Sequence, residues 1–197
     1  MAAFFSSLNR TIVAGIVIVL VMIGVAGTFQ SFGQMAYWQF FMRWLHILSG
    51  VMWIGLLWYF NFVQTPSMPK IPDEQKPAIG KVIAPTALFW FRWGAMSTLI
   101  TGALLAWMNG YLVQALSLQK PFIPIGVGAW LAIIMWFNVW FIIWPNQKKV
   151  LGIVQAAPDE KAAAGKRAGM ASRINTMLSI PMLYFMVAQT HGIGLAF

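Results

Sequence analysis

The chain has 197 residues, of which 60% are hydrophobic and 9% are charged, and its mean hydropathy is +0.73. Soluble domains carry roughly 25% charged residues, so this composition excludes an ordinary soluble enzyme and predicts an all-α, polytopic membrane helical bundle in a single domain, residues 1–197. The absence of cysteine excludes disulfides, thiolate metal sites, iron–sulfur clusters and covalently attached c-type haem. The net charge of +9 comes from basic residues beside hydrophobic segments, which predicts contact with the lipid bilayer and no nucleic acid partner.

About five transmembrane helices are predicted, because each of five segments offers roughly the 20 mainly apolar residues that cross a bilayer core. These predicted spans are residues 11–29, 37–62, 82–108, 122–144 and 174–194. The first span has Arg10 before it and small residues near Ala26, so it also resembles a secretory signal peptide. Removal of this span therefore stays an alternative.

The charges between the predicted spans alternate along the chain. The connections 61–81 and 145–173 carry three and six basic residues, whereas 30–36 carries none and 109–121 carries only Lys120. Because basic loops are enriched on the cytoplasmic side of a membrane, this pattern predicts a cytoplasmic N-terminus and a C-terminus on the outer side.

The chain has two histidines, His46 in the second predicted span and His191 near the end of the fifth. His46 follows Tyr37 by nine positions, roughly 14 Å along a helix, and His191 lies close to the C-terminus, so both are predicted in the outer half of the membrane. An imidazole at membrane depth needs a partner, which makes each histidine a functional candidate. We predict that His46 and His191 are the two axial metal ligands of a haem b.

Arg43 and Gly50 lie about one turn on either side of His46 and share its helix face. The glycine removes side-chain bulk beside the imidazole, which would let a flat macrocycle approach the backbone. The arginine could meet a propionate carboxylate. Both residues are therefore predicted to belong to the cofactor-binding site.

Arg92 lies about ten residues into the third predicted span, where a charge costs roughly 2.5–3.5 kcal/mol on insertion scales. The spans contain no acidic residue that could pair with it. Its remaining partners are backbone carbonyls, water, lipid phosphate, the faces of Trp90 and Trp93, or an anionic ligand. We include Arg92 among the predicted cofactor-binding residues.

Structural interpretations of the same residues stay open. His46 could hydrogen-bond a serine or a carbonyl on a neighbouring helix, His191 could be a solvated interfacial residue, and Arg43 could reach the interface by snorkelling. One histidine alone could ligate haem or another metal. The 13 methionines are scattered, which favours apolar packing over a copper site. The sequence identifies no catalytic residue.

A known family is suggested by residues 43–55, RWLHILSGVMWIG, and by their continuation into WYFNFVQ at residues 58–64. This stretch resembles the membrane domain of the bacterial PuuD-type urate oxidases (urate hydroxylases), and residues 91–95 and 181–191 are compatible with the same family. The resemblance covers most of residues 37–197. A weaker likeness, of the type His-x-x-x-Gly-x-x-Trp, extends to the HemJ-type protoporphyrinogen oxidases and the CopD-type copper proteins.

The resemblance implies a protein of the bacterial inner membrane, with a periplasmic C-terminus, that oxidises urate to 5-hydroxyisourate in purine metabolism. It also implies that the electrons pass to a cytochrome c and not to oxygen. Longer members of the family append a cytochrome c domain, whereas this chain has no Cys-x-x-Cys-His motif. An external cytochrome c or a respiratory complex is therefore the expected electron acceptor. Urate is expected to bind as a monoanion, which suits a buried arginine.

Two other functions stay open. The same haem could relay electrons in a non-catalytic accessory subunit of a respiratory membrane complex, and two axial imidazoles favour this function because they leave the iron no open position. The third function is that of a metal-handling or transport membrane protein without haem. The lack of acidic residues and of paired broken helices within the spans argues against it.

Overall fold

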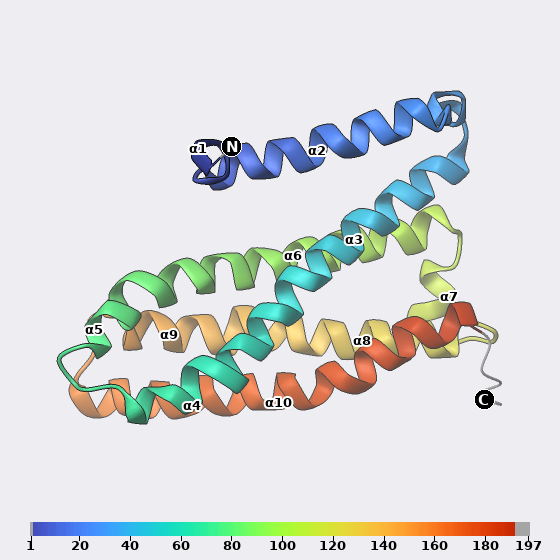
Figure 1. Cartoon of the computed structure of the whole chain (residues 1–197). Coiled ribbons are helices and arrows are strands. Elements are labelled where there is room, and N and C mark those ends of the chain that lie inside the picture. Colours follow the sequence, from blue (N-terminus) through green and yellow to red (C-terminus); the bar gives the residue numbers. More distant parts are fainter. Residues whose placement is uncertain (1, 192–197) are drawn as a thin grey trace. The chain divides into compact units, whose positions relative to one another are not determined.

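The structure is a computed structural model that describes residues 2–191, except for the side chains of residues 2, 3, 29, 190 and 191. Every regular element in this part of the chain is a helix, which confirms the predicted all-α class (Figure 1). The chain divides into two compact units, Met1–Phe41 and Met42–Phe197.

The first unit contains α1 (Ala2–Phe5), α2 (Leu8–Val25), η1 (Thr28–Gly33) and the start of α3 (Met35–Trp58). Arg10 is the only charged residue of α2, and none of its side chains is buried. The helix ends just before Gly27, whose φ of 68° lies in the left-handed region that favours glycine. An apolar helix whose side chains are not buried by the rest of the chain is suited to a lipid environment.

The second unit contains the rest of α3 and the elements that follow it. In chain order these are η2 (Tyr59–Gln64), α4 (Thr65–Ser67), η3 (Met68–Lys70), α5 (Lys76–Ala78), η4 (Ile79–Ile83), α6 (Ala84–Met108), α7 (Leu112–Leu116), α8 (Ile123–Phe137), η5 (Asn138–Ile143), α9 (Trp144–Val150) and α10 (Pro158–His191). Figure 1 shows α8 lying between α6 and α10, and both pairs of helices are in contact.

Three helices are long and apolar enough to cross a membrane, namely Leu8–Val25, Met35–Lys70 and Ile123–Val150. They coincide with the first, second and fourth predicted spans. The third and fifth predicted spans also form helices, α6 and α10, but these are not among the three. The helical bundle is thus present, and five membrane crossings remain a prediction.

Two of the long helices continue further than their predicted spans because prolines fall where a helix tolerates them. Pro66 and Pro145 each occupy one of the first two positions of an α-helical segment that directly follows a π-helical segment. Short π-helical segments, η2 and η5, join the neighbouring α-helices into continuous rods. A third π-helical segment, η4, precedes α6 in the same way.

α10 begins sixteen residues before the predicted fifth span, within a stretch that was expected to be a connection. Pro158 opens the helix, and Asp159 and Glu160 in its first turn favour the positive end of the helix dipole. Alanines at 162–164 add strong helix propensity. These are sequence signals for a helix start, and the hydropathy of the span alone does not detect them.

The core of the second unit lies where α3, α6, α8, η5 and α10 meet. Its fully or nearly fully buried apolar side chains are Trp53, Leu57, Phe91, Ala95, Met135, Val139 and Ile143. Gly94 permits the close approach of α6 to α3, since a Cβ on it would lie 3.2 Å from the backbone nitrogen of Trp53. Small residues at such crossings are typical of helix packing in membranes.

Candidate functional site

His46 is held against α6 through one ring nitrogen. Its Nδ1 lies 3.0 Å from the carbonyl oxygen of Thr98 and 3.3 Å from Oγ1 of Thr101. A carbonyl oxygen can only accept a hydrogen bond, so Nδ1 carries the proton and donates to Thr98. In a neutral imidazole this leaves Nε2 with a lone pair, and Nε2 has no hydrogen-bond partner among the described residues. A ring nitrogen in this state can ligate a metal.

Gly102 provides the space for this imidazole, a role that the sequence analysis missed. A Cβ on Gly102 would lie 2.8 Å from Cε1 of His46, closer than real Cβ atoms approach other groups, and 3.1 Å from its Nδ1, which is also a tight contact. Gly50, which was predicted to leave room beside His46, has nothing within 4 Å of its Cβ position. The open space at Gly50 is compatible with its predicted role, whereas Gly102 makes the contact with the ring.

Arg43 is exposed and lies within electrostatic range of Tyr111, in the connection after α6. Burial raises the pKa of the Tyr111 phenol, and the positive charge of Arg43 opposes this rise. The Tyr111 ring also stacks on Phe122, with ring centroids 5.0 Å apart. The structure therefore places Arg43 near a half-buried phenol, one turn from His46.

Arg92 finds its aromatic partner on another helix than the sequence suggested. Its Cζ lies 3.4 Å from the centroid of the Trp144 ring, at the start of α9. Trp90 and Trp93, its neighbours in sequence, are 52% and 49% exposed. Cation–π contact is worth about 0.5–2 kcal/mol, which offsets part of the cost of the charge. The Nε of Arg92 is buried and has no hydrogen-bond partner among the described residues.

His191 is the last residue of α10, and its side chain lies outside the described residues. The predicted pairing of His46 with His191 is therefore an open prediction. Within the described residues no group of three or more histidine, cysteine or acidic side chains could hold a metal ion. A haem iron needs only one or two axial ligands from the chain, so axial ligation by His46 and His191 does not require such a group.

A set of buried amides and hydroxyls connects the helices and was not anticipated from the sequence. Asn138 donates to Oδ1 of Asn175 at 2.8 Å, and Asn175 donates to the carbonyl oxygen of Met135 at 2.9 Å. Trp58 donates to Oγ of Ser179 at 3.0 Å. Asn138, Asn175 and Ser179 are 8%, 0% and 0% exposed, so these contacts satisfy polar groups that would otherwise be costly.

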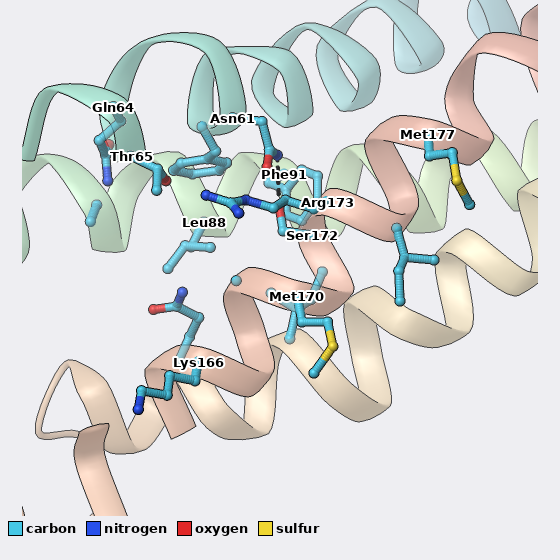
Figure 2. Close-up of a pocket in the computed structure, with 16 residues that line it drawn as sticks. Asn61, Gln64, Thr65, Leu88, Phe91, Lys166, Met170, Ser172, Arg173 and Met177 are labelled. Atoms are coloured by element: carbon cyan, nitrogen blue, oxygen red, sulfur yellow. Dashed lines mark hydrogen bonds between the residues drawn. The ribbon is translucent and has the colours of Figure 1, made fainter. Parts of the chain in front are cut away.

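A cavity of about 700 Å³ opens where η2, α6 and α10 face one another. Figure 2 shows its labelled lining residues, with Asn61, Gln64 and Thr65 on one wall and Lys166 and Arg173 on α10. Asn61 donates to the carbonyl oxygen of Leu57 at 2.9 Å and to Oγ of Ser172 at 2.8 Å, which ties the two walls together. The sequence predicts a connection at residues 61–81 and therefore does not indicate this cavity.

The family model described as "Urate oxidase N-terminal" matches residues 110–196. This match supports a relation to urate oxidases. It covers α7 to α10, including Asn138, Asn175 and the α10 wall of the cavity, whereas His46 and the stretch 43–64 lie outside it. No curated protein and no solved structure matches the chain.

Proposed function

We propose that the protein is a membrane redox protein of the urate oxidase type, which binds haem b through His46 and His191 and passes electrons from urate to a cytochrome c. The observation that carries the proposal is the hydrogen bond from Nδ1 of His46 to the Thr98 carbonyl oxygen. Metal-ligating histidines usually donate their second ring N–H in this way, which fixes the tautomer and orients the ring. The family match over residues 110–196 supports the urate oxidase relation.

The residues around His46 fit a haem. Nε2 has the lone pair that an iron ligand needs, Gly50 faces open space, and Gly102 gives the imidazole room to lie against α6. Arg43 lies three positions before His46 and Arg92 lies six positions before Thr98, and both would stabilise anionic groups of a cofactor or substrate. The unpaired Nε of Arg92 is a buried donor that an anionic acceptor would satisfy.

Haem b, when bound, supplies a one-electron redox centre. Oxidation of urate to 5-hydroxyisourate removes two electrons and two protons and adds the oxygen atom of one water, so each turnover requires two one-electron transfers to cytochrome c. The chain's own contribution is to hold and orient the imidazole through Thr98 and to stabilise negative charge through the two arginines.

The test is an absorption spectrum of the detergent-purified protein before and after anaerobic addition of urate. We expect a reduced b-type band on addition of dithionite, the same band on addition of urate, and loss of the band in both His46→Ala and His191→Ala. Ser49→Ala is the matched control. Ser49 lies on the same helix as His46 and its hydroxyl contacts that of Ser97 on α6 at 2.9 Å, but a serine cannot serve as an imidazole ligand. It should keep the band.

The other outcomes separate the alternatives. A band that dithionite reduces and urate does not would replace the proposal with an accessory electron-transfer subunit. A protein with no b-type band would refute haem binding altogether. A band that survives one histidine substitution would refute the paired ligation.

A further inference from the structure

The cavity between η2, α6 and α10 lies at the end of the bundle that carries the basic connections. Two membrane-length helices, Met35–Lys70 and Ile123–Val150, each contribute residues from their last third to its lining. Residues 61–81 and 145–173 include these two helix ends and carry three and six basic residues. Basic segments beside apolar helices lie at the level of the lipid head groups. We therefore expect the cavity, of about 700 Å³, at the surface of the bilayer.

Two cations face this cavity without a carboxylate partner. Lys166 and Arg173 line it from α10, and their spacing of seven residues, about two turns, places them on one face of that helix. None of the lining residues is acidic, and neither cation forms an ion pair in the part of the chain that the structure describes. Figure 2 shows the Arg173 side chain reaching across the cavity toward the wall that carries Asn61 and Thr65. These features favour an anionic ligand.

Apolar side chains beside these cations are accessible. Met170, Ile174 and Met177 line the cavity from the same face of α10 and are 61%, 42% and 62% exposed. A water-soluble anion would leave this apolar surface uncovered, whereas the hydrocarbon chain of a lipid would cover it. The lining therefore favours a ligand that joins a negative charge to an apolar chain.

The opposite walls offer neutral hydrogen-bond donors. Thr65 at the start of α4 and Gln147 in α9 both line the cavity. Neither side chain makes a hydrogen bond to another described residue, so the hydroxyl and the amide are available to the oxygens of a phosphate group.

We propose that this cavity binds an anionic phospholipid by its phosphate group. Arg173 and Lys166 pair with the phosphate, and one acyl chain lies along Ile174 and Met177. Lys166 precedes Met177 by eleven residues of α10, which is roughly 16 Å at about 1.5 Å per residue. The face is therefore long enough for a head group and the first part of an acyl chain.

The inference goes beyond the proposed redox function. Asn61 in the cavity wall follows His46 by fifteen residues along one continuous helix, which is roughly 20 Å at about 1.5 Å per residue. Lipid binding at this place requires neither histidine, so either conclusion can fail without the other.

The probe is dioleoyl phosphatidylglycerol, titrated into the delipidated full chain in a non-ionic detergent and followed by native mass spectrometry. Dioleoyl phosphatidylcholine has the same acyl chains and phosphate, but its choline group neutralises the head group. Glycerol 3-phosphate has the charge without the acyl chains, and it separates a lipid site from a site for a soluble phosphate. We expect phosphatidylglycerol to bind at least roughly tenfold more tightly than either compound.

Variants assign the binding to the cavity. The double variant Lys166→Gln/Arg173→Gln should weaken phosphatidylglycerol binding roughly tenfold or more, because both charged hydrogen bonds are lost. Lys70→Gln/Arg167→Gln is the matched control, since it removes one lysine and one arginine that are exposed and do not line the cavity. It should bind like the wild type.

A second pair of variants tests the apolar surface, and His46→Ala tests independence from haem. Met177→Ser should weaken phosphatidylglycerol binding roughly threefold or more, because less apolar area is covered. Ile180→Ser, at an exposed position of α10 outside the cavity, should leave it unchanged. His46→Ala should bind phosphatidylglycerol like the wild type, even if it loses the b-type band.

Three results would overturn the inference. The first is equal weakening by the two double variants, which would indicate a general effect of net charge. The second is phosphatidylcholine binding as tight as phosphatidylglycerol binding, which would show that the cations do not select the head group. The third is glycerol 3-phosphate binding as tight as that of the lipid, which would make the cavity a site for a soluble phosphate.

Discussion

At the scale of single residues, two features of α6 position the imidazole of His46: a backbone carbonyl oxygen that accepts its hydrogen bond, and a glycine that leaves space for the ring. Thr98 supplies the carbonyl oxygen for Nδ1, and Gly102, one turn later on α6, has no side chain to displace the ring. Thr98 and Thr101 satisfy their own hydroxyls within α6, by donating to the carbonyl oxygens of Gly94 and Ser97. The Thr98 carbonyl oxygen is therefore the acceptor that orients the ring.

Gly102→Ala should disturb haem binding without unfolding the helix. Its Cβ would lie 2.8 Å from Cε1 of His46, so the ring must move and its hydrogen bond to Thr98 must lengthen. Loss of such a supporting contact typically weakens metal binding about 10- to 100-fold. Haem titration of the purified protein, followed at the absorption band, measures the change.

Gly55→Ala is the control for this substitution. It makes the same chemical change in α3, and nothing lies within 4 Å of the added Cβ. Its haem affinity should stay close to that of the wild type. Equal weakening in the two variants would show that contact with the imidazole is not the cause.

The sequence identified His46, Arg43 and Arg92 as polar residues in apolar segments, but it could not assign their partners. Thr98 and Trp144 each lie on another helix, 52 positions from the residue they contact, and hydropathy carries no information about which helices meet. A small-residue pattern in α6, Gly94 and Gly102 eight residues apart, was the available signal for the α3–α6 crossing. The cavity could not be predicted, because three of its lining residues belong to η2, which the sequence did not identify as a helix.

At the scale of elements, α7 shows how a short helix can be fixed by close backbone approach. A Cβ on Gly126 of α8 would overlap the carbonyl oxygen of Ala115 and would lie 2.8 Å from a methyl group of Leu118. Ala115 is 3% exposed, so α7 packs tightly against the start of α8. Trp130 of α8 also donates to the carbonyl oxygen of Leu116 at 2.9 Å. The backbone at this junction has little room to move.

Gly126→Ala should destabilise the protein. The overlap with a backbone oxygen costs about 1–3 kcal/mol, as overpacking usually does, and this exceeds the roughly 1 kcal/mol that alanine gains over glycine in a helix. We expect the apparent melting temperature in detergent to fall by a few degrees in circular dichroism or tryptophan fluorescence.

Gly55→Ala in α3 is the comparison, because its added Cβ meets nothing within 4 Å. It should melt at or above the wild-type temperature. If Gly126→Ala has the same melting temperature as Gly55→Ala, the contact between α7 and α8 is looser than the structure shows.

The helices themselves were largely predictable, because apolar segments of about 20 residues leave few alternatives. Their ends were less so. The predicted connections 61–81 and 145–173 contain α4, η3, α5, α9 and the first half of α10, all of which are polar enough to lower the mean hydropathy. Proline at a helix start and acidic residues in the first turn, as in Pro158–Glu160, mark such helices better than hydropathy does.

At the scale of the whole molecule, the alternating loop charges predict an orientation that chemical labelling can test. The chain has no cysteine, so a single introduced cysteine reports without background. Lys120 lies in the predicted outer connection and Lys161 in the predicted cytoplasmic one, and both are exposed. In intact cells a membrane-impermeant maleimide should label Lys120→Cys, and should label Lys161→Cys only after permeabilisation.

The opposite pattern would reverse the predicted orientation. Labelling of both cysteines from the same side would contradict a membrane crossing by Ile123–Val150, the helix that separates them. The cysteine-free parent chain controls for non-specific labelling.

The buried amide pair of Asn138 and Asn175 has a consequence for the alignment of two helices. In lipid, apolar helices gain little from hiding their surfaces from each other, so two such helices could slide by one turn at small cost. A slide would separate the amides and leave both unpaired away from water. The pair therefore fixes the axial register of the two helices. It thereby also fixes the position of Arg173, two residues before Asn175, along the facing helix.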